Sequence, residues 1–317
     1  MSGWRAALVA AIVGGLVLLA GWAIPRITAP SNGTTTTTAT GPPATADVTL
    51  ACPLALRPAC DSLGEEVGAA VRTWTAGDPI SDDEVLVAPP GDLPDGLASS
   101  GELARSPVAV AVWLERANVL SSGCGGDPDL ACVEGALGQQ WSDLGGSDSW
   151  GIFKLGLADP TLTEPGLAAW SALAGDGTPE GLAESLRLVA SDDGRLMSDM
   201  VLFGPSRADA AVTTEVAIAS QLANAPGRGG RLVVTYPDPA PWVSYVVAPG
   251  GGSEARRTAE RLLEPDIASL LGPAGLRPPA GDPGGLPEGL GQPGVQSPPL
   301  DDATSQTLLD SWRDLTQ

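Results

Sequence analysis

The chain has 317 residues, 43% of them hydrophobic, so it is long enough to bury the core of one large domain or two small ones. Its formal net charge of −21 disfavours nucleic acid and anionic lipid as partners. The absence of histidine excludes Ser-His-Asp and Cys-His catalysis and every His-liganded metal site. We therefore expect no enzyme activity, no catalytic residues, no metal and no cofactor.

The N-terminal segment 1–26 contains 19 uncharged residues, at 6–24, flanked by Arg5 and Arg26. This length can span a bilayer and exceeds the core of most signal peptides, so we predict a transmembrane anchor, with a cleaved signal peptide as the alternative. A Thr/Pro-rich linker follows at 27–46, and its composition is typical of an extracellular stalk. These features predict a single-pass cell-membrane protein whose domain lies outside the cell.

The four cysteines form two equally spaced pairs, Cys52 with Cys60 and Cys124 with Cys132. Four cysteines allow three connectivities, and the two local pairings close short loops. Disulfides of this kind fit an extracytoplasmic domain. A zinc site is the alternative, although neither pair has the two- to four-residue gap that is typical of zinc ligands.

Between residues 47 and 271, short apolar runs alternate with helical periodicity. Strands are expected at 47–51, 84–88, 107–113, 152–157, 231–236 and 241–248. Helices are expected at 63–71, 129–141, 181–190, 209–224, 254–263 and 267–271, and a last helix at 301–315 with one apolar stripe. This alternation predicts an α/β fold with mainly parallel sheets. The Pro/Gly-rich stretch 274–299 should form no regular structure.

Residues 150–173 predict a strand, a tight loop and then a helix. Thr161 and Thr163 can each cap the helix, Pro165 suits its first turn, and Gly166 leaves room for close approach of another group. The free amides of a helix N-terminus would then lie at the carboxyl end of a strand, which is where open α/β sheets bind ligands. An ordinary strand-to-helix connection is the alternative interpretation.

Six segments, taken in order, resemble one protein family. They are DVTLACPLAL at 47–56, ARSPVAVAVW at 104–113, KLGLADPTLTEPGLAAWSAL at 154–173, TTEVAIA at 213–219, LVVTYPDPAPWVSYVVAP at 232–249, and AERLLEPDIASLLGPAGLRPPAG at 259–281. The chain resembles bacterial extracellular solute-binding proteins of the type 2 periplasmic-binding-protein fold. It looks closest to the actinobacterial group whose members often carry a von Willebrand factor A domain.

The resemblance implies a two-lobed domain at 47–281, with two crossing hinge strands and a ligand cleft between the lobes. Lobe one would comprise 47–112 plus 243–281 and lobe two 113–242, followed by a tail and C-terminal helix at 282–317. Strand-to-helix connections would line the cleft. The ligand-binding residues expected there are Pro53, Leu54, Ser106, Thr161, Thr163, Gly166, Thr213, Thr214 and Tyr236.

The function that these features predict is capture of a small solute for a membrane transporter or a signalling partner, without chemistry. Asp159 and Glu164 lie near the expected cleft, so a highly charged anion is disfavoured, and a neutral or partly cationic solute is favoured. The alternative is a cell-envelope protein-interaction module that keeps the fold and binds no ligand.

Overall fold

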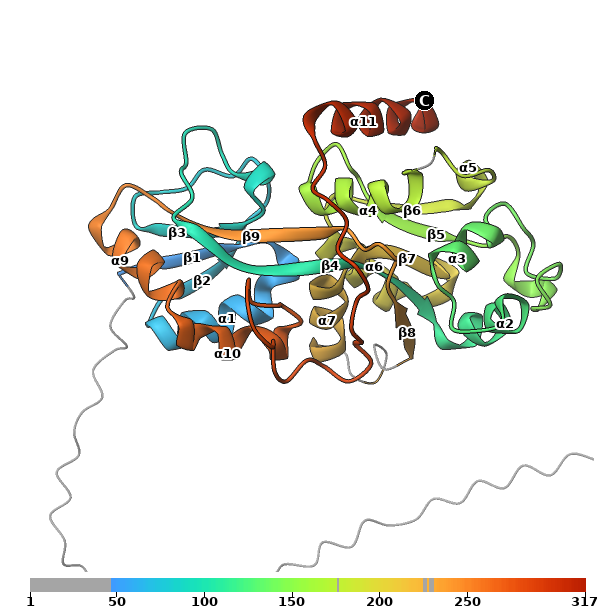
Figure 1. The fold of residues 1–317 in the computed structure, drawn as a ribbon, viewed down its shortest axis with the longest axis horizontal. Helices are drawn as coiled ribbons and strands as arrows, with labels where there is room; N and C mark the ends of the chain where they lie inside the picture. Colours follow the sequence, from blue (N-terminus) through green and yellow to red (C-terminus); the bar gives the residue numbers. More distant parts are fainter. Residues whose placement is uncertain (1–46, 176, 225–226, 228–230) are drawn as a thin grey trace, which may run out of the picture. The chain divides into compact units, whose positions relative to one another are not determined.

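The computed structural model describes residues 47–317, except 176, 225–226 and 228–230 (Figure 1). The predicted anchor at 1–26 and linker at 27–46 lie outside the described residues. Within the part of the chain that is described, no helix is both long and apolar enough to cross a membrane.

The strands form one nine-stranded system in the order β2-β1-β3-β9-β4-β7-β5-β6, with β8 pairing to β4 off this path. Sheet A contains β2 (Ala70–Thr73), β1 (Thr49–Cys52), β3 (Glu84–Ala88), β9 (Trp242–Pro249) and the first part of β4 (Gly101–Trp113). Sheet B contains the second part of β4 with β7 (Ala210–Thr214), β5 (Leu155–Ala158), β6 (Leu186–Ala190) and β8 (Leu232–Thr235). Figure 1 shows β4 running through both sheets.

Helices cover these sheets and end the chain (Figure 1). The helices that follow strands of sheet A in the chain are η1 (Leu54–Leu56), α1 (Arg57–Val67), η2 (Pro90–Asp92), α9 (Ser253–Leu262), η5 (Pro265–Ile267), α10 (Ala268–Leu271) and η6 (Gly272–Ala274). The helices that follow strands of sheet B in the chain are α2 (Leu114–Cys124), α3 (Leu130–Ala136), η3 (Asp148–Trp150), α4 (Glu164–Ala174), α5 (Leu182–Ser185), α6 (Asp193–Phe203), η4 (Gly204–Ser206) and α7 (Glu215–Asn224). The final helix, α11 (Asp302–Thr316), packs on α4.

Strand β4 passes from one sheet to the other at Pro107. Pro107 is the last residue that pairs with β9, and Val108 is the first that pairs with β7. A proline lacks the N–H that a central strand needs, so it fits the point where one ladder ends. The run from Val108 to Val112 is fully buried, which explains why it reads as continuously apolar.

The pairing is mixed, so the prediction of mainly parallel sheets is only partly right. β1 runs parallel to β2 and β3, and β5 runs parallel to β6 and β7. β9 runs antiparallel to β3 and β4, and β4 runs antiparallel to β7 and β8. The antiparallel pairs arise because β4 and β9 join the two sheets.

Three of the predicted helices are wrong over part of their length. The helix predicted at 63–71 ends at Val67, and its last two residues belong to strand β2. The stretch 181–190 folds as the single turn α5 followed by strand β6, and 209–224 folds as strand β7 followed by α7. β7 lies between β4 and β5 and is buried throughout, so its residues show no alternation that would distinguish a strand from a helix. Strand β2 and helices α2 and α6 were not predicted.

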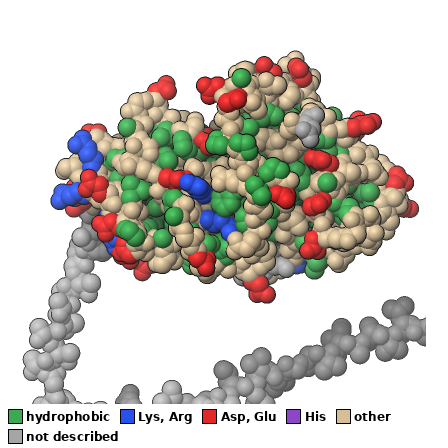
Figure 2. Space-filling view, viewed as in Figure 1, with side chains coloured by type: hydrophobic (Ala, Val, Ile, Leu, Met, Phe, Trp, Pro, Cys, Tyr) green, Lys and Arg blue, Asp and Glu red, His purple; other side chains and the backbone are tan. Residues whose placement is uncertain are grey.

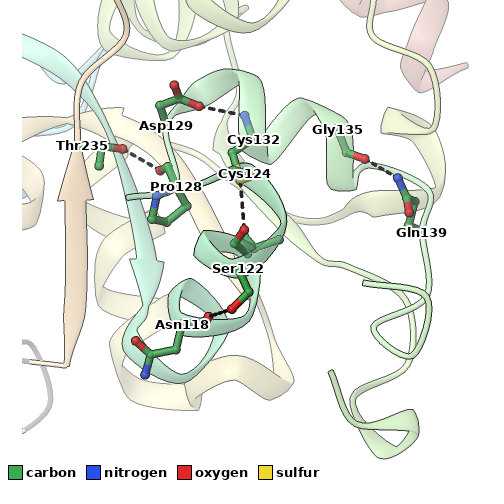
Figure 3. Close-up of a disulfide and its surroundings, with 10 residues drawn as sticks. Asn118, Ser122, Cys124, Pro128, Asp129, Cys132, Gly135, Gln139 and Thr235 are labelled. Atoms are coloured by element: carbon green, nitrogen blue, oxygen red, sulfur yellow. Dashed lines mark hydrogen bonds between the residues drawn. A yellow bond between two sulfur atoms is a disulfide. The ribbon is translucent and has the colours of Figure 1, made fainter. Parts of the chain in front are cut away.

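Both predicted disulfides are present, with Cα–Cα distances of 6.6 Å for Cys52–Cys60 and 5.9 Å for Cys124–Cys132. The first joins the end of β1 to α1 across η1. The second joins the end of α2 to α3, where Asp129 caps α3 by accepting from the Cys132 amide at 2.9 Å (Figure 3). The zinc alternative is therefore wrong.

Replacing Cys52 and Cys60 together by alanine should lower the free energy of unfolding by about 2–3 kcal/mol, because the unfolded chain then regains the entropy of an open loop. Urea unfolding monitored by tryptophan fluorescence measures this loss. The matched control replaces Cys124 and Cys132, which close a loop of the same length. A loss from the first pair no larger than experimental error would contradict the prediction.

Candidate functional site

The carboxyl ends of strands from both sheets meet around one pocket of about 250 Å³, which we call the strand-end pocket. Sheet A contributes the connections after β1, β2 and β3, and sheet B contributes those after β5 and β6. Its principal lining residues are Pro53, Leu54, Trp74, Asp92, Thr163, Asp193 and Tyr245. This is the position at which open α/β sheets bind ligands.

Helix α4 begins at the pocket as the sequence predicts. The Thr163 hydroxyl accepts from the Gly166 amide at 3.2 Å, and Pro165 occupies the first turn. A Cβ atom at Gly166 would lie 2.7 Å from the Asp159 carbonyl oxygen. Gly166 is therefore required by the packing of its own loop, and no ligand is needed to explain it.

Two reciprocal hydrogen bonds join the connection after β3 to the start of α4. The Gly91 amide donates to Glu164 Oε2 at 2.7 Å, and the Glu164 amide donates to Asp92 Oδ1 at 2.7 Å. They link sheet A to sheet B beside the pocket. They also occupy amides that the resemblance had suggested for a ligand.

Helix α6 starts at the pocket with its amides similarly occupied. Asp192 caps the helix by accepting from the Arg195 amide at 2.7 Å, and Asp193 Oδ1 accepts from the Gly194 amide at 2.9 Å. A Cβ atom at Gly194 would lie 2.5 Å from the Ala55 nitrogen. The start of α6 therefore packs directly against η1, with no room for a side chain between them.

Asp193 lies under the pocket and is only 4% exposed. Its Oδ2 accepts from the Thr214 hydroxyl. Tyr245 of β9 is 1% exposed and lines the same pocket, and its hydroxyl lies beside Thr214 without making a hydrogen bond of normal geometry to any described residue.

Burial raises the pKa of three carboxyl groups at this site, those of Asp92, Glu164 and Asp193. It raises the pKa of Asp193 to about 6 and that of Asp92 to about 7, with the neighbouring Glu164 charge adding to the effect at Asp92. The pKa of Glu164 is raised by burial as well. The pocket therefore concentrates negative charge in a place where water stabilises it poorly.

The structure brings together some of the residues expected to bind a ligand. Pro53, Leu54 and Thr163 line the strand-end pocket. Thr161 and Tyr236 line a wider groove of about 1380 Å³ that η2, α4 and the tail also border. Figure 2 shows the surface hollowed between the loops above β3 and helix α11.

The other expected residues lie below these surfaces. Ser106 is buried and accepts from the Val216 amide at 3.0 Å. Thr213 and Thr214 are buried at the end of β7, where Thr214 reaches the pocket through Asp193. Their positions assign Ser106 and Thr214 a role in supporting neighbouring groups.

The sequence reasoning missed four residues that define the pocket, namely Trp74, Asp92, Asp193 and Tyr245. Asp92 follows the Pro-Pro-Gly turn after the strand at 84–88, which was a usable signal. Asp193 follows the run LRLVA, which was assigned to a helix, so its place at a strand end was not recognised.

Comparison with known proteins identifies the fold. No protein family and no curated protein matches the sequence. Among solved structures, a periplasmic thiamin binding protein matches with a TM-score of 0.56 at 12% identity, covering 85% of this chain and 96% of that chain. The sulfate-binding protein SubI from Mycobacterium tuberculosis H37Rv matches with a TM-score of 0.51 at 13% identity, covering 84% and 91%.

These likenesses show the fold of type 2 periplasmic solute-binding proteins, as the sequence predicted. A third match, L-phospholactate-bound PEB3, has a TM-score of 0.50 at 14% identity and covers 73% of this chain and 99% of its own. The narrower resemblance to the actinobacterial group associated with von Willebrand factor A domains stays a prediction.

Replacing Asp193 by asparagine should flatten the dependence of stability on pH. Because the pKa of Asp193 is raised on folding, its protonation stabilises the folded state fully below about pH 4, and this stabilisation is lost as the pH rises through about 6. The free energy of unfolding should therefore fall between pH 5 and pH 8, and in the Asp193→Asn variant this fall should be smaller by on the order of 1 kcal/mol.

Urea unfolding at pH 5, 6.5 and 8 measures the effect. Asp209→Asn is the matched control, because Asp209 is equally buried but accepts from Arg116 Nε at 2.8 Å. That variant should be destabilised by about 3–5 kcal/mol over the same pH range, since it leaves a buried guanidinium unpaired. Equal pH profiles for the wild type and Asp193→Asn would contradict the prediction.

Proposed function

We propose that this chain is an extracellular solute-binding protein, which captures a small solute in the strand-end pocket and passes it to a transporter or signalling partner. The observation that carries this proposal is the pocket at the strand ends of both sheets, in a fold shared with solute-binding proteins. Those neighbours are named for binding and not for catalysis, in keeping with the expectation that the chain is not an enzyme.

The proposed lobes are 47–112 plus 243–281 and 113–242. The division is supported by the two sheets, which share β4 and are joined again by the connection from β8 to β9. The solute would touch both lobes and bind the closed arrangement better than an open one. The contacts of Gly194 with η1 and of Glu164 with Asp92 belong to such a closed arrangement.

Solute binding is testable by a thermal-shift screen. The panel contains thiamin, sulfate and L-phospholactate, which the neighbours' names suggest, together with amino acids, sugars and amines. A solute that binds only the folded protein adds about 2.7 kcal/mol of stability at 100 times its Kd, which raises the melting temperature. The same solute should also reduce the radius of gyration in small-angle scattering.

The Gly194→Val variant tests whether closure is needed. Its side chain would collide with η1, so the variant should have a larger radius of gyration and should lose the thermal shift. Gly123→Ala is the control, because a Cβ there meets no atom within 4 Å and leaves α2 intact. Normal binding by Gly194→Val would refute the closure account.

The alternative function is a cell-envelope interaction module that binds no solute. The occupied amides at the starts of α4 and α6 favour it, because these groups are already satisfied by the protein itself. It predicts that no compound of any charge raises the melting temperature.

Tethering by residues 1–26, with the domain outside the cell, is also a proposal, and it rests on the uncharged stretch and on the two disulfides. An alkaline phosphatase reporter, which matures only outside the cytoplasm, should be active when fused after residue 46 and should fractionate with membranes. An inactive fusion that is made in normal amounts would overturn the topology, and a soluble secreted product would indicate a cleaved signal peptide.

A further inference from the structure

The chain contains buried carboxylates of two kinds. Asp209 accepts from Arg116, and Glu215 accepts from Arg277 through two bonds of 2.9 and 2.8 Å. Both are completely buried, and each has a guanidinium as its countercharge. This is the usual way in which a protein tolerates an ionised group in its interior.

The carboxylates at the strand-end pocket have no such partner. Among the described residues, neither Asp92, Glu164 nor Asp193 forms an ion pair with a lysine or arginine. Arg195 is the only described basic residue that lines the pocket, and its side chain is 59% exposed and pairs with Asp199 at 3.1 Å. The described residues therefore supply no positive charge to complete this site.

A second, independent feature also indicates a missing ligand group. The Tyr245 side chain lines the pocket, and its buried hydroxyl lies beside Thr214 without a hydrogen bond of normal geometry to any described residue. Leaving such a group unsatisfied destabilises the folded protein, so a hydrogen-bond partner supplied by a bound solute would be favourable.

The remaining walls are apolar and aromatic. Trp74 is 3% exposed, and its ring is fixed because Nε1 donates to the Asp78 carbonyl at 3.0 Å. Leu54 and Leu162 stand at the pocket with more than a third of their surface exposed. Such walls suit a hydrocarbon frame, and an indole beside the pocket also favours a cation through its π-face.

An anion or a metal ion fits this site poorly. The helix amides that could hold an anion already bind the chain's own carboxylates, which would repel a second negative charge. The described residues contain no group of three or more acidic or cysteine side chains placed to hold a metal ion.

We infer that the strand-end pocket takes a small organic cation, with an ammonium group held by Asp92, Asp193 and the Tyr245 hydroxyl and an apolar frame against Trp74, Leu54 and Leu162. This inference rests on the proposed solute-binding function and names its ligand class. Cation binding supplies the countercharge that Arg116 provides at Asp209 and Arg277 at Glu215.

Affinity for such a cation should increase with pH. The charged and titratable groups facing the site are Asp92, Asp192, Asp193, Arg195 and Tyr245, with Glu164 beside Asp92. The raised pKa values of Asp92 and Asp193 mean that acid protonates them near neutrality. Protonation removes the charge that attracts the ligand. The affinity should therefore increase about 10-fold from pH 5 to pH 8. At a pH near the pKa values of Asp92 and Asp193, binding of the cation should release protons from these carboxyl groups.

The test uses three probes of one shape: choline, its uncharged carbon analogue 3,3-dimethylbutan-1-ol, and the anion 3,3-dimethylbutanoate. A second set is n-butylammonium, n-butanol and butyrate. Saturation-transfer NMR and calorimetry on the purified domain at constant ionic strength detect binding even when it is weak. Choline keeps its charge at every pH, so any rise in its affinity with pH comes from the protein.

The cations should bind at least 10-fold more tightly than their neutral partners, and the anions should not bind. Asp193→Asn and Asp92→Asn should each weaken choline binding about 10-fold. Tyr245→Phe should weaken n-butylammonium binding several-fold, because the hydroxyl accepts from an N–H that choline lacks, without lowering the melting temperature. Glu254→Gln removes the same charge on α9, at the end of sheet A that lies away from sheet B (Figure 1), and should leave binding unchanged.

Three outcomes would overturn the inference. If neutral or anionic solutes bind as tightly as cations, and the Asp193 variant still loses that binding, the pocket is a solute site of another ligand class. If cations bind but the Asp92 and Asp193 variants keep full affinity, the cation site lies elsewhere. If no probe and no compound in the solute panel binds, the inference and the proposed function both fail.

Discussion

The continuous strand β4 is the constraint on which the rest of the structure depends. Because one strand pairs with β9 up to Pro107 and with β7 from Val108, the two sheets have fixed directions relative to each other. Their parallel strands then end at the same place, with β1, β2 and β3 on one side and β5 and β6 on the other. The pocket follows from this arrangement, and its residues come from segments nearly 200 positions apart.

Charge is distributed inside the protein in two ways that serve different purposes. Arg116 holds Asp209 and stacks over Trp150 at 3.4 Å, which fixes the loops beside sheet B. Arg277 holds Glu215 at the start of α7 and donates to the Gly291 carbonyl at 2.7 Å, which fixes the tail. Both pairs are complete and contribute to a unique fold. Asp193 is almost as deeply buried but pairs with no described lysine or arginine. The free-energy cost of burying a carboxylate without a countercharge is typical of ligand-binding sites.

The sequence predicted the parts of this arrangement that depend on neighbouring residues. Both disulfides, the cap at Thr163 and the buried run of β4 could be read from local spacing. Strands β6 and β7 could not, because short apolar runs buried on both faces carry no period that separates strand from helix. The pocket carboxylates were missed for a related reason. Asp193 looks like a solvated turn residue until β6 is recognised as a strand that ends beside η1.

The tail limits how freely the two sheets can move apart. The resemblance implied two crossing hinge strands between the lobes, and the residues after η6 form a further link. This segment is held by Arg277 near α7, and it ends in α11, whose Leu308 carbonyl accepts from Trp170 Nε1 of α4 at 2.8 Å. Trp312 packs edge-on against the same ring at 5.2 Å.

Since Glu164 at the start of α4 contacts Asp92, any rotation that opens the pocket must carry α11 with α4 and extend the tail. Opening therefore breaks contacts both at the pocket and at the far end of α4, which limits how far the two sheets can separate when no solute is bound.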